Sequence, residues 1–181
     1  MSSVHTVTRS SARQPLRDAR ARVVSRDANA AFANVVLGTH LRALTLVTPW
    51  VTDQQGGCEA FGRLLDWANR CRATVNLITR PTASEPHGRA ANLVLAAGGR
   101  VTYNEALHAK IYVAQFSDGR RVALVGSANL TAASVDLLES AILIQSPARR
   151  RGPDLIDDLF AVPVRRILSD PRSRTTWRRP G

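Results

Sequence analysis

Lysine, methionine, cysteine and aromatic residues are all scarce in this chain of 181 residues, in which aromatic side chains make up 5%. Its two cysteines, Cys58 and Cys71, lack the spacing of a metal site and are too few for a disulfide framework, so both are expected to be reduced. No apolar run approaches the roughly 18 residues of a membrane-spanning helix. The N-terminal residues lack the apolar core of a signal peptide. These absences predict a cytoplasmic protein with no transmembrane segment.

Positive charge is what the chain has in excess. Its 25 basic residues outnumber its 14 acidic residues, which gives a formal net charge of +11. An excess of this size favours a polyanionic partner, with nucleic acid first and an anionic membrane surface second. A compositional bias toward arginine would produce the same excess without any ligand, and both interpretations stay open.

Lys110 is the one lysine of the chain, since the other basic residues are 24 arginines. An ammonium group is a compact point charge, whereas a guanidinium group is a broad planar fork. Lys110 follows His108 by two residues. A position that keeps the smaller head group in so arginine-rich a chain is expected to need it.

The first part of the chain alternates between strand and helix patterns. Buried-strand patterns and helical spacings follow one another, the strands at 41–47, 73–79 and 100–103 and the helices at 27–37, 58–72 and 89–97. This order is typical of parallel strands joined by helices that cover the sheet.

The second part reads as antiparallel. A strand at 107–116 is followed by the turn sequence Ser117-Asp118-Gly119-Arg120 and a returning strand at 121–125. A further strand is predicted at 140–145, and an amphipathic helix at 154–168 with an interruption near Pro163. The whole pattern predicts an α/β fold with a mixed sheet and helices on both faces.

Three segments follow from composition and patterning. Residues 1–26 are polar and rich in arginine, and they are expected to form a basic flexible arm with a short helix at 16–24. Residues 27–168 are predicted to form the catalytic domain. Residues 169–181 are expected to form a second basic tail. No internal repeat is present, so the chain carries one set of candidate site residues.

The predicted hairpin brings a group of polar side chains together. Side chains two apart on a strand point the same way, which places His108 and Lys110 side by side with their Cα atoms about 7 Å apart. The returning strand ends at Gly126, followed by Ser127 and Asn129, which can share a face. Glycine at 126 allows a close backbone approach or an unusual dihedral angle. A helix expected to begin near residue 130 would point its N-terminus at the same place.

These residue types can perform phosphoryl chemistry without a metal or another cofactor. His108 would attack phosphorus and form a phosphohistidine. Lys110 and Asn129 would stabilise the charge that develops on the non-bridging oxygens. Glu139, at the start of the next strand, could hold the imidazole in the tautomer that leaves the attacking nitrogen free.

The segments H-A-K at 108–110 and G-S-A-N at 126–129 resemble the phospholipase D superfamily motif H-x-K-x4-D-x6-G-S-x-N, and the resemblance covers roughly residues 27–146. It implies a phospholipase D-like sandwich. It gives His108 the place of the nucleophile, Lys110 and Asn129 those of the phosphate ligands, and Ser127 that of the motif serine. Glu139 resembles the acidic residue that usually follows, one position earlier than expected. The motif aspartate falls on Gln115, whose opposite strand parity should turn its side chain away from the phosphate.

The resemblance also implies what the site does. Two motifs face each other across the active site in this superfamily, so one motif per chain implies a homodimer with a shared site. Single-motif bacterial members resemble endonucleases, which predicts metal-independent hydrolysis of DNA or RNA. Two alternatives stay open. One is hydrolysis of phospholipid head groups, and the other is a nucleic-acid-binding module whose site is degenerate because Gln115 replaces the aspartate.

Overall fold

The computed structural model of the protein describes residues 20–136, 139–148 and 154–177. In these residues eight strands form one sheet: β1 (Arg20–Val24), β2 (Leu41–Val47), β3 (Thr74–Thr79), β4 (Arg100–Tyr103), β5 (Ile111–Phe116), β6 (Arg121–Gly126), β7 (Ala141–Ser146) and β8 (Arg174–Trp177). The helices are α1 (Ala28–Val36), α2 (Glu59–Arg70), α3 (Glu85–Ala96), the short α4 (Ala133–Asp136), α5 (Leu155–Leu159), the π-helical η1 (Phe160–Val164) and α6 (Arg165–Ser169).

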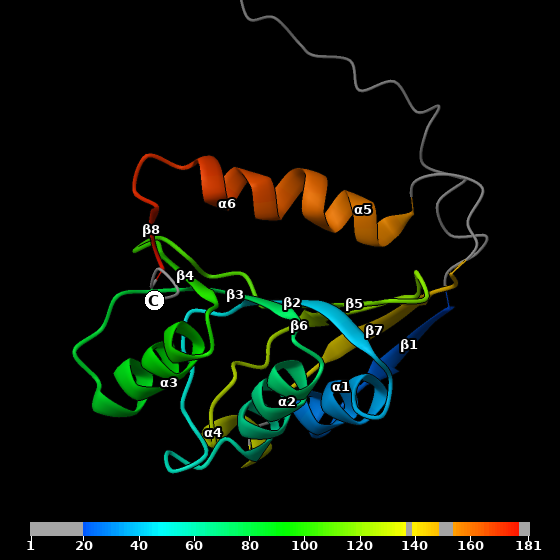
Figure 1. Cartoon of the computed structure of the whole chain (residues 1–181), viewed down its shortest axis with the longest axis horizontal. Coiled ribbons are helices and arrows are strands. Elements are labelled where there is room, and N and C mark those ends of the chain that lie inside the picture. The colour runs from blue at the N-terminus through cyan, green and yellow to red at the C-terminus, as the bar shows by residue number, and fades with distance from the viewer. Residues whose placement is uncertain (1–19, 137–138, 149–153, 178–181) are drawn as a thin grey trace, which may run out of the picture.

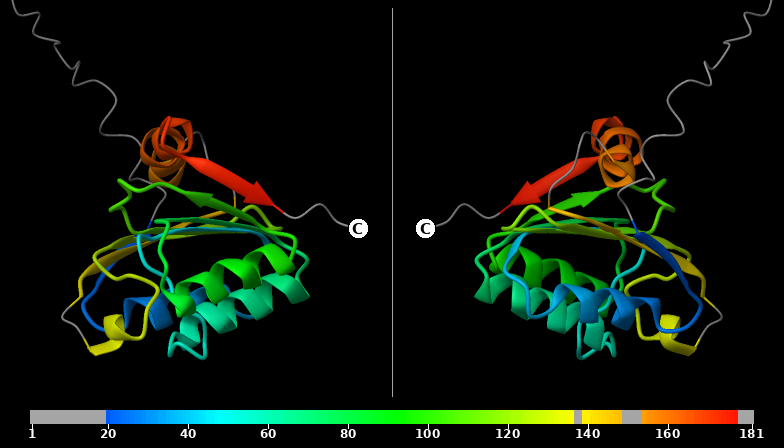
Figure 2. Two further views of the ribbon diagram at one scale, coloured as in Figure 1. Left: turned by 90° about the vertical axis from the view of Figure 1, so that its left-hand side faces the viewer. Right: turned by 90° about the vertical axis from the view of Figure 1, so that its right-hand side faces the viewer.

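The sheet is mixed and lies between two layers of helices (Figures 1 and 2). Its strand order is β1-β7-β6-β5-β2-β3-β4-β8, with β2, β3 and β4 parallel and all other pairs antiparallel. Helices α1, α2 and α3 cover one face, and α5, η1 and α6 cross the other. The predicted α/β class, with a mixed sheet and helices on both faces, is confirmed.

Each face of the sheet carries its own hydrophobic core. The larger core lies under α1, α2 and α3 and includes Phe32, Phe61 and Tyr112. The smaller core lies under α5 and η1 and includes Ile156 and Val164. Successive residues of one strand contribute to opposite cores, as the period of two requires.

Most of the predicted elements are confirmed within one or two residues. Strand β2 has the predicted bounds, and α1 begins after Asp27, whose side chain accepts a hydrogen bond from the Ala30 amide. Helix α3 begins four residues before the predicted 89–97, because Pro86 lies in its first turn, where a missing N–H costs nothing. In the last helix the π-helical turn contains Pro163, which confirms the predicted interruption.

The sheet extends beyond the predicted catalytic domain at both ends. Strand β1 pairs with β7, and β8 pairs with β4. The helix predicted at 16–24 is therefore wrong over 20–24, which form a strand. Residues 16–19 lie outside the described residues. So do most of the predicted arm and the end of the predicted tail. Pairing satisfies the backbone groups that β7 and β4 would otherwise expose as sheet edges. Patterning alone did not indicate it, because β1 has almost no buried side chains.

None of the helices described has both the length and the apolar character needed to cross a membrane. Cys58 is buried and Cys71 partly buried, and neither forms a disulfide in this structure. That both are reduced stays a prediction.

Candidate active site

The site residues predicted from the sequence lie at the open end of the β5–β6 hairpin. Strand β5 begins at Ile111, so residues 107–110 precede it and are not part of the strand predicted at 107–116. The alternation of side chains continues through them nevertheless. Leu107 and Ala109 belong to the core under α5, whereas Tyr112 belongs to the core under α1. His108 and Lys110 therefore project to the Tyr112 side, where His108 is exposed and Lys110 half-buried.

A backbone hydrogen bond joins the two halves of the motif. The Gly126 amide donates to the Lys110 carbonyl at 3.3 Å. Strand β7 passes so close to Gly126 that an added Cβ would lie 2.5 Å from the Ala141 Cβ and would also clash with the Ser140 carbonyl. Glycine is therefore required at position 126 because the neighbouring backbone leaves no room for a Cβ. The alternative reason, an unusual dihedral angle, does not apply, since the φ of Gly126 is not positive.

Ser127 is fully engaged with the start of β7. Its hydroxyl donates to the Glu139 carboxylate and accepts from the Ser140 amide at 3.1 Å, and its own amide donates to the Ser140 carbonyl at 3.0 Å. Glu139 is buried. Among the described residues no hydrogen bond joins Glu139 to His108, so the predicted role of Glu139 toward the imidazole stays a prediction. Ser127 acts here as the group that positions Glu139.

Asn129 is held by neighbouring elements on both sides. Its side-chain oxygen accepts a hydrogen bond of 3.2 Å from the Thr48 hydroxyl, and its carbonyl accepts one of 2.7 Å from the Asn29 amide group. The Tyr112 hydroxyl donates to the Ala128 carbonyl at 2.6 Å. Burial raises the pKa of Tyr112, which keeps this hydroxyl a neutral donor. The loop after β6 is thus fixed. Among the described residues the side-chain N–H groups of Asn129 donate no hydrogen bond, which leaves them available to a ligand.

Lys110 and His108 keep unused hydrogen-bonding capacity. The Lys110 ammonium donates to the His108 carbonyl at 3.0 Å, which leaves two of its three N–H donors. No carboxylate lies within ion-pair distance of Lys110 in the parts of the chain that the structure describes. Within the same parts the His108 imidazole makes no hydrogen bond. A cation and an imidazole with this freedom can bind and attack a phosphate group.

The helix expected to begin near residue 130 is present, but it begins later and is short. Helix α4 has four residues and begins at Ala133. Leu130 instead forms a parallel bridge with Val51, and its carbonyl accepts from the Thr52 amide at 2.8 Å. The Leu130 backbone is therefore paired with another segment and does not begin the helix.

Gln115 lies on the opposite side of β5 from His108. Its neighbours Ala114 and Phe116 belong to the core under α1, so Gln115 points the other way, in agreement with its predicted parity. Ten residues separate it from Gly126, where the motif has six. The extra residues lengthen each of the two strands of the hairpin by two. Because side chains alternate with a period of two, the same side chains still share a face. Asp118 accepts from the Arg120 amide at 2.9 Å, as expected of a turn residue.

The other described histidines have structural contacts. His87 is buried in α3, not in the predicted loop, and accepts a hydrogen bond of 3.3 Å from the Val51 amide. Burial lowers its pKa. His40 contacts the Ser117 hydroxyl at 2.8 Å. Sequence reasoning missed Thr48, the side chain that contacts Asn129. A polar residue directly after a buried strand was the signal that could have found it.

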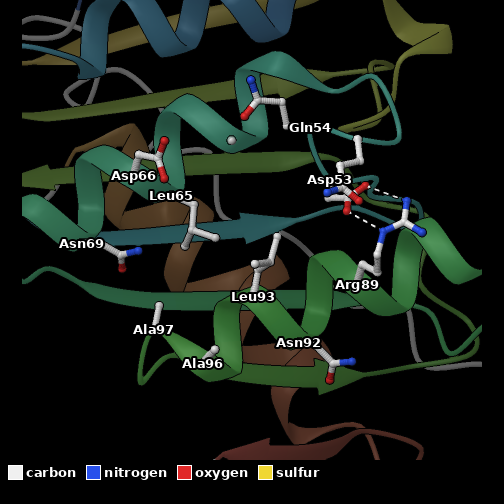
Figure 3. A pocket seen from close by; sticks show the side chains of 12 residues that line it. Asp53, Gln54, Leu65, Asp66, Asn69, Arg89, Asn92, Leu93, Ala96 and Ala97 are labelled. Carbon is white, nitrogen blue, oxygen red and sulfur yellow. Dashed lines mark hydrogen bonds and ion pairs between the residues drawn. The ribbon is translucent and has the colours of Figure 1, made fainter.

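A cleft of about 740 Å³ lies between α2 and α3. Leu65 and Leu93 line it together with amide side chains such as Asn69 and Asn92 (Figure 3). At one end the Arg89 guanidinium donates to both carboxylate oxygens of Asp53, at 2.7 and 3.2 Å. Hydrogen bonding to Arg89 lowers the pKa of Asp53. None of the predicted site residues lines this cleft.

Comparison with known proteins identifies the fold. No protein-family model and no curated protein matches the sequence. A phospholipase D family member, Nuc from Salmonella typhimurium, matches with a TM-score of 0.64 at 12% identity, over 88% of this chain and 99% of Nuc. NucT from Helicobacter pylori matches with a TM-score of 0.51 at 14% identity, over 72% of this chain and 87% of NucT. Polyphosphate kinase from Porphyromonas gingivalis matches with a TM-score of 0.59 at 14% identity, over 84% of this chain and 26% of the kinase.

The chain therefore has a phospholipase D-like fold that matches Nuc, as the motif resemblance implied. Identities of 12 to 14% show the fold alone. Part of a polyphosphate kinase also matches this fold, as a phospholipase D family member does, so the activity of the chain has to be argued from its site.

Proposed function

We propose that this protein is a phosphodiesterase, and more narrowly a nuclease that hydrolyses DNA or RNA through a phosphohistidine intermediate. The observation that carries the proposal is the junction at the open end of the hairpin. There the hydrogen bond from Gly126 to Lys110 joins the segment of His108 and Lys110 to the fixed Asn129 loop, and no described residue forms a hydrogen bond with the imidazole or an ion pair with the ammonium. The fold that this chain shares with Nuc, a phospholipase D family member, agrees with the motif resemblance.

The proposed reaction has two steps. An imidazole nitrogen of His108 attacks phosphorus, a P–N bond forms, and the P–O bond to the leaving group breaks as a general acid protonates the leaving oxygen. Water then attacks the same phosphorus, the P–N bond breaks, and the former acid takes the water proton. The two unused N–H donors of Lys110 and the amide of Asn129 stabilise the negative charge in both steps.

A second copy of the chain supplies the general acid in this proposal. The sequence contains one histidine-lysine motif, and Glu139 is already bonded to Ser127. A two-fold axis through the site would bring His108 of the partner subunit to the leaving oxygen without any further sequence. The active form is thus a homodimer with one site formed by two subunits.

Nucleic acid is the substrate that the charge favours. A net charge of +11 favours a polyanionic ligand. Phospholipid head groups offer the same phosphodiester and are the alternative that the substrate test has to separate. A cytoplasmic location stays a prediction.

The first test is cleavage of single-stranded DNA, duplex DNA and RNA in the presence of EDTA. We expect cutting in EDTA that disappears in His108→Asn. Binding without cutting in both proteins would contradict the enzyme and favour a binding module with a degenerate site. Hydrolysis of phosphatidylcholine without cleavage of any nucleic acid would replace the nuclease with a lipid hydrolase.

The second test asks whether one site needs two copies of His108. Inactive His108→Asn is mixed with an equal amount of the unmodified protein, under conditions of subunit exchange and saturating substrate. Random pairing puts about half of the unmodified chains in mixed dimers, so activity per unmodified chain should fall by about half. Mixing with His40→Asn, a surface variant away from the motif, is the control and should change nothing. An unchanged rate in the first mixture would show that each chain acts alone.

A further inference from the structure

Trp50 is a large aromatic side chain left partly in solvent beside the candidate site. It follows strand β2, and 42% of its surface is exposed, in a chain whose aromatic content is only 5%. The next residue, Val51, is fully buried, so the backbone here is anchored while the indole projects outward. An exposed indole costs solvation free energy unless a ligand covers it.

The Trp50 backbone is tied directly to the loop that carries Asn129. The Thr48 hydroxyl donates to the Trp50 carbonyl at 2.8 Å and contacts the Asn129 side-chain oxygen at 3.2 Å. Val51 forms a bridge with Leu130. These contacts place the Trp50 backbone next to the loop that carries Asn129, one of the proposed phosphate ligands.

A cation accompanies the indole. The Arg80 guanidinium carbon lies 5.5 Å from the Trp50 ring centroid, and the His87 ring meets the indole at 76° with 6.3 Å between centroids. Among the described residues no carboxylate pairs with Arg80. The ring is therefore held by its neighbours, and the positive charge next to it is not neutralised by an acidic side chain.

We propose that Trp50 and Arg80 form a binding site for one unpaired nucleotide of a single-stranded nucleic acid, with the base stacked on the indole and the flanking phosphate bound by the guanidinium. This proposal rests on the proposed phosphodiesterase function and names its preferred substrate. Any base can stack on an indole, so the site is expected to tolerate all sequences. Bases inside a duplex are already stacked on each other, so the site favours single strands over duplexes.

The test is binding of a fluorescently labelled 12-nucleotide DNA strand to His108→Asn protein, in which the substrate stays intact. In that background Trp50→Ala should weaken binding of the strand about 10-fold, within the range expected for one stacked base. Trp50→Phe should restore most of the loss, because an aromatic face remains. For an abasic sugar-phosphate strand of the same length, Trp50→Ala should change binding less than about twofold, since that strand offers no base to stack.

Trp177→Ala is the matched control. Trp177 is also exposed, at 60%, but it lies in β8 at the far edge of the sheet. Its replacement should leave binding of both strands unchanged. Equal losses from Trp177→Ala and Trp50→Ala would overturn the proposal, as would an equal loss by Trp50→Ala on the intact and abasic strands.

Two further outcomes would also overturn it. If Trp50→Ala converts a dimer to a monomer by light scattering, the indole belongs to a subunit contact. If Trp50→Ala weakens binding to phosphatidylglycerol vesicles and leaves DNA binding unchanged, the indole belongs to a lipid surface. Failure of the nuclease is a separate result. If the protein cuts nothing but Trp50 still supports base-dependent binding, the nucleotide site stands and the nuclease is contradicted. If the protein cuts but binding through Trp50 shows no base dependence, the nuclease stands and the nucleotide site is contradicted.

Discussion

The β5–β6 hairpin carries charged groups at both of its ends, and the two ends differ in whether these groups have ion-pair partners. Near the turn, the guanidinium of Arg121 is buried and forms ion pairs with Asp154 and Asp157. Asp154 also accepts from the Ser146 hydroxyl and caps α5. At the open end, His108 and Lys110 have no carboxylate partner among the described residues.

We interpret Arg121 as a charge that stabilises the fold, and His108 and Lys110 as the charged groups of the proposed site. A buried charge needs compensation from partners, and Arg121 uses its partners to fasten α5 onto the sheet. A charge that binds a ligand must keep its capacity free until the ligand arrives. We therefore expect substitutions near the turn to change stability and substitutions at the open end to change activity.

The largest expected effect is that of His108→Asn at the open end. Loss of the proposed nucleophile, and of the proposed acid in the partner subunit, should lower phosphodiester cleavage by at least about 1,000-fold. The free energy of unfolding should change by less than about 0.5 kcal/mol, because the imidazole is exposed. Initial rates and urea unfolding measure the two quantities. A matching loss of stability would make His108 a structural residue and remove the contrast.

Arg121→Met tests the other end of the hairpin. Removing the guanidinium that two carboxylates share should destabilise the protein by about 3 to 5 kcal/mol. Cleavage by the molecules that remain folded at low temperature should be unchanged, because Arg121 lies away from the site. Urea unfolding and cleavage assays at 10 °C are the measurements. Arg120→Met, which removes an exposed ion pair of the turn, is the control and should cost less than about 1 kcal/mol.

Lys110→Arg keeps the charge but changes its shape. The broader guanidinium cannot take the place of the ammonium between the His108 carbonyl and a phosphate, so turnover should fall about 10- to 100-fold. Stability should not change. Arg100→Lys, an exchange of the opposite kind at an exposed strand residue, should leave the turnover number as it is. An unchanged rate for Lys110→Arg would remove Lys110 from the mechanism.

Gln115→Asp should have the smallest effect. Position 115 faces away from the site, so restoring the motif aspartate should change the cleavage rate less than about twofold and stability by less than about 0.5 kcal/mol. Initial rates beside those of Gln115→Asn give the comparison. A large rise in activity with aspartate alone would mean that the side chain reaches the phosphate, contrary to its strand parity.

The central strands and helices of the fold could be predicted from residue patterns, whereas the edge strands could not. Strand β2 and helix α1 follow from an apolar run and a capping aspartate, signals that lie within a few residues of each other. Strand β1 pairs through its backbone and buries almost no side chain, so it leaves no periodic pattern to detect. The short α4 begins later than predicted, because Leu130 pairs with Val51, a residue 79 positions earlier.

The sequence alone determined which groups could do the chemistry, because a histidine and a lysine two residues apart on an alternating segment must share a face. It also indicated the fold, since the order of strands and helices allows few arrangements. Only the tertiary structure decided how those groups are engaged. The contact of Asn129 with Thr48 and the exposed Trp50 beside it depend on segments about 80 residues apart in the chain, and no local pattern encodes such a meeting.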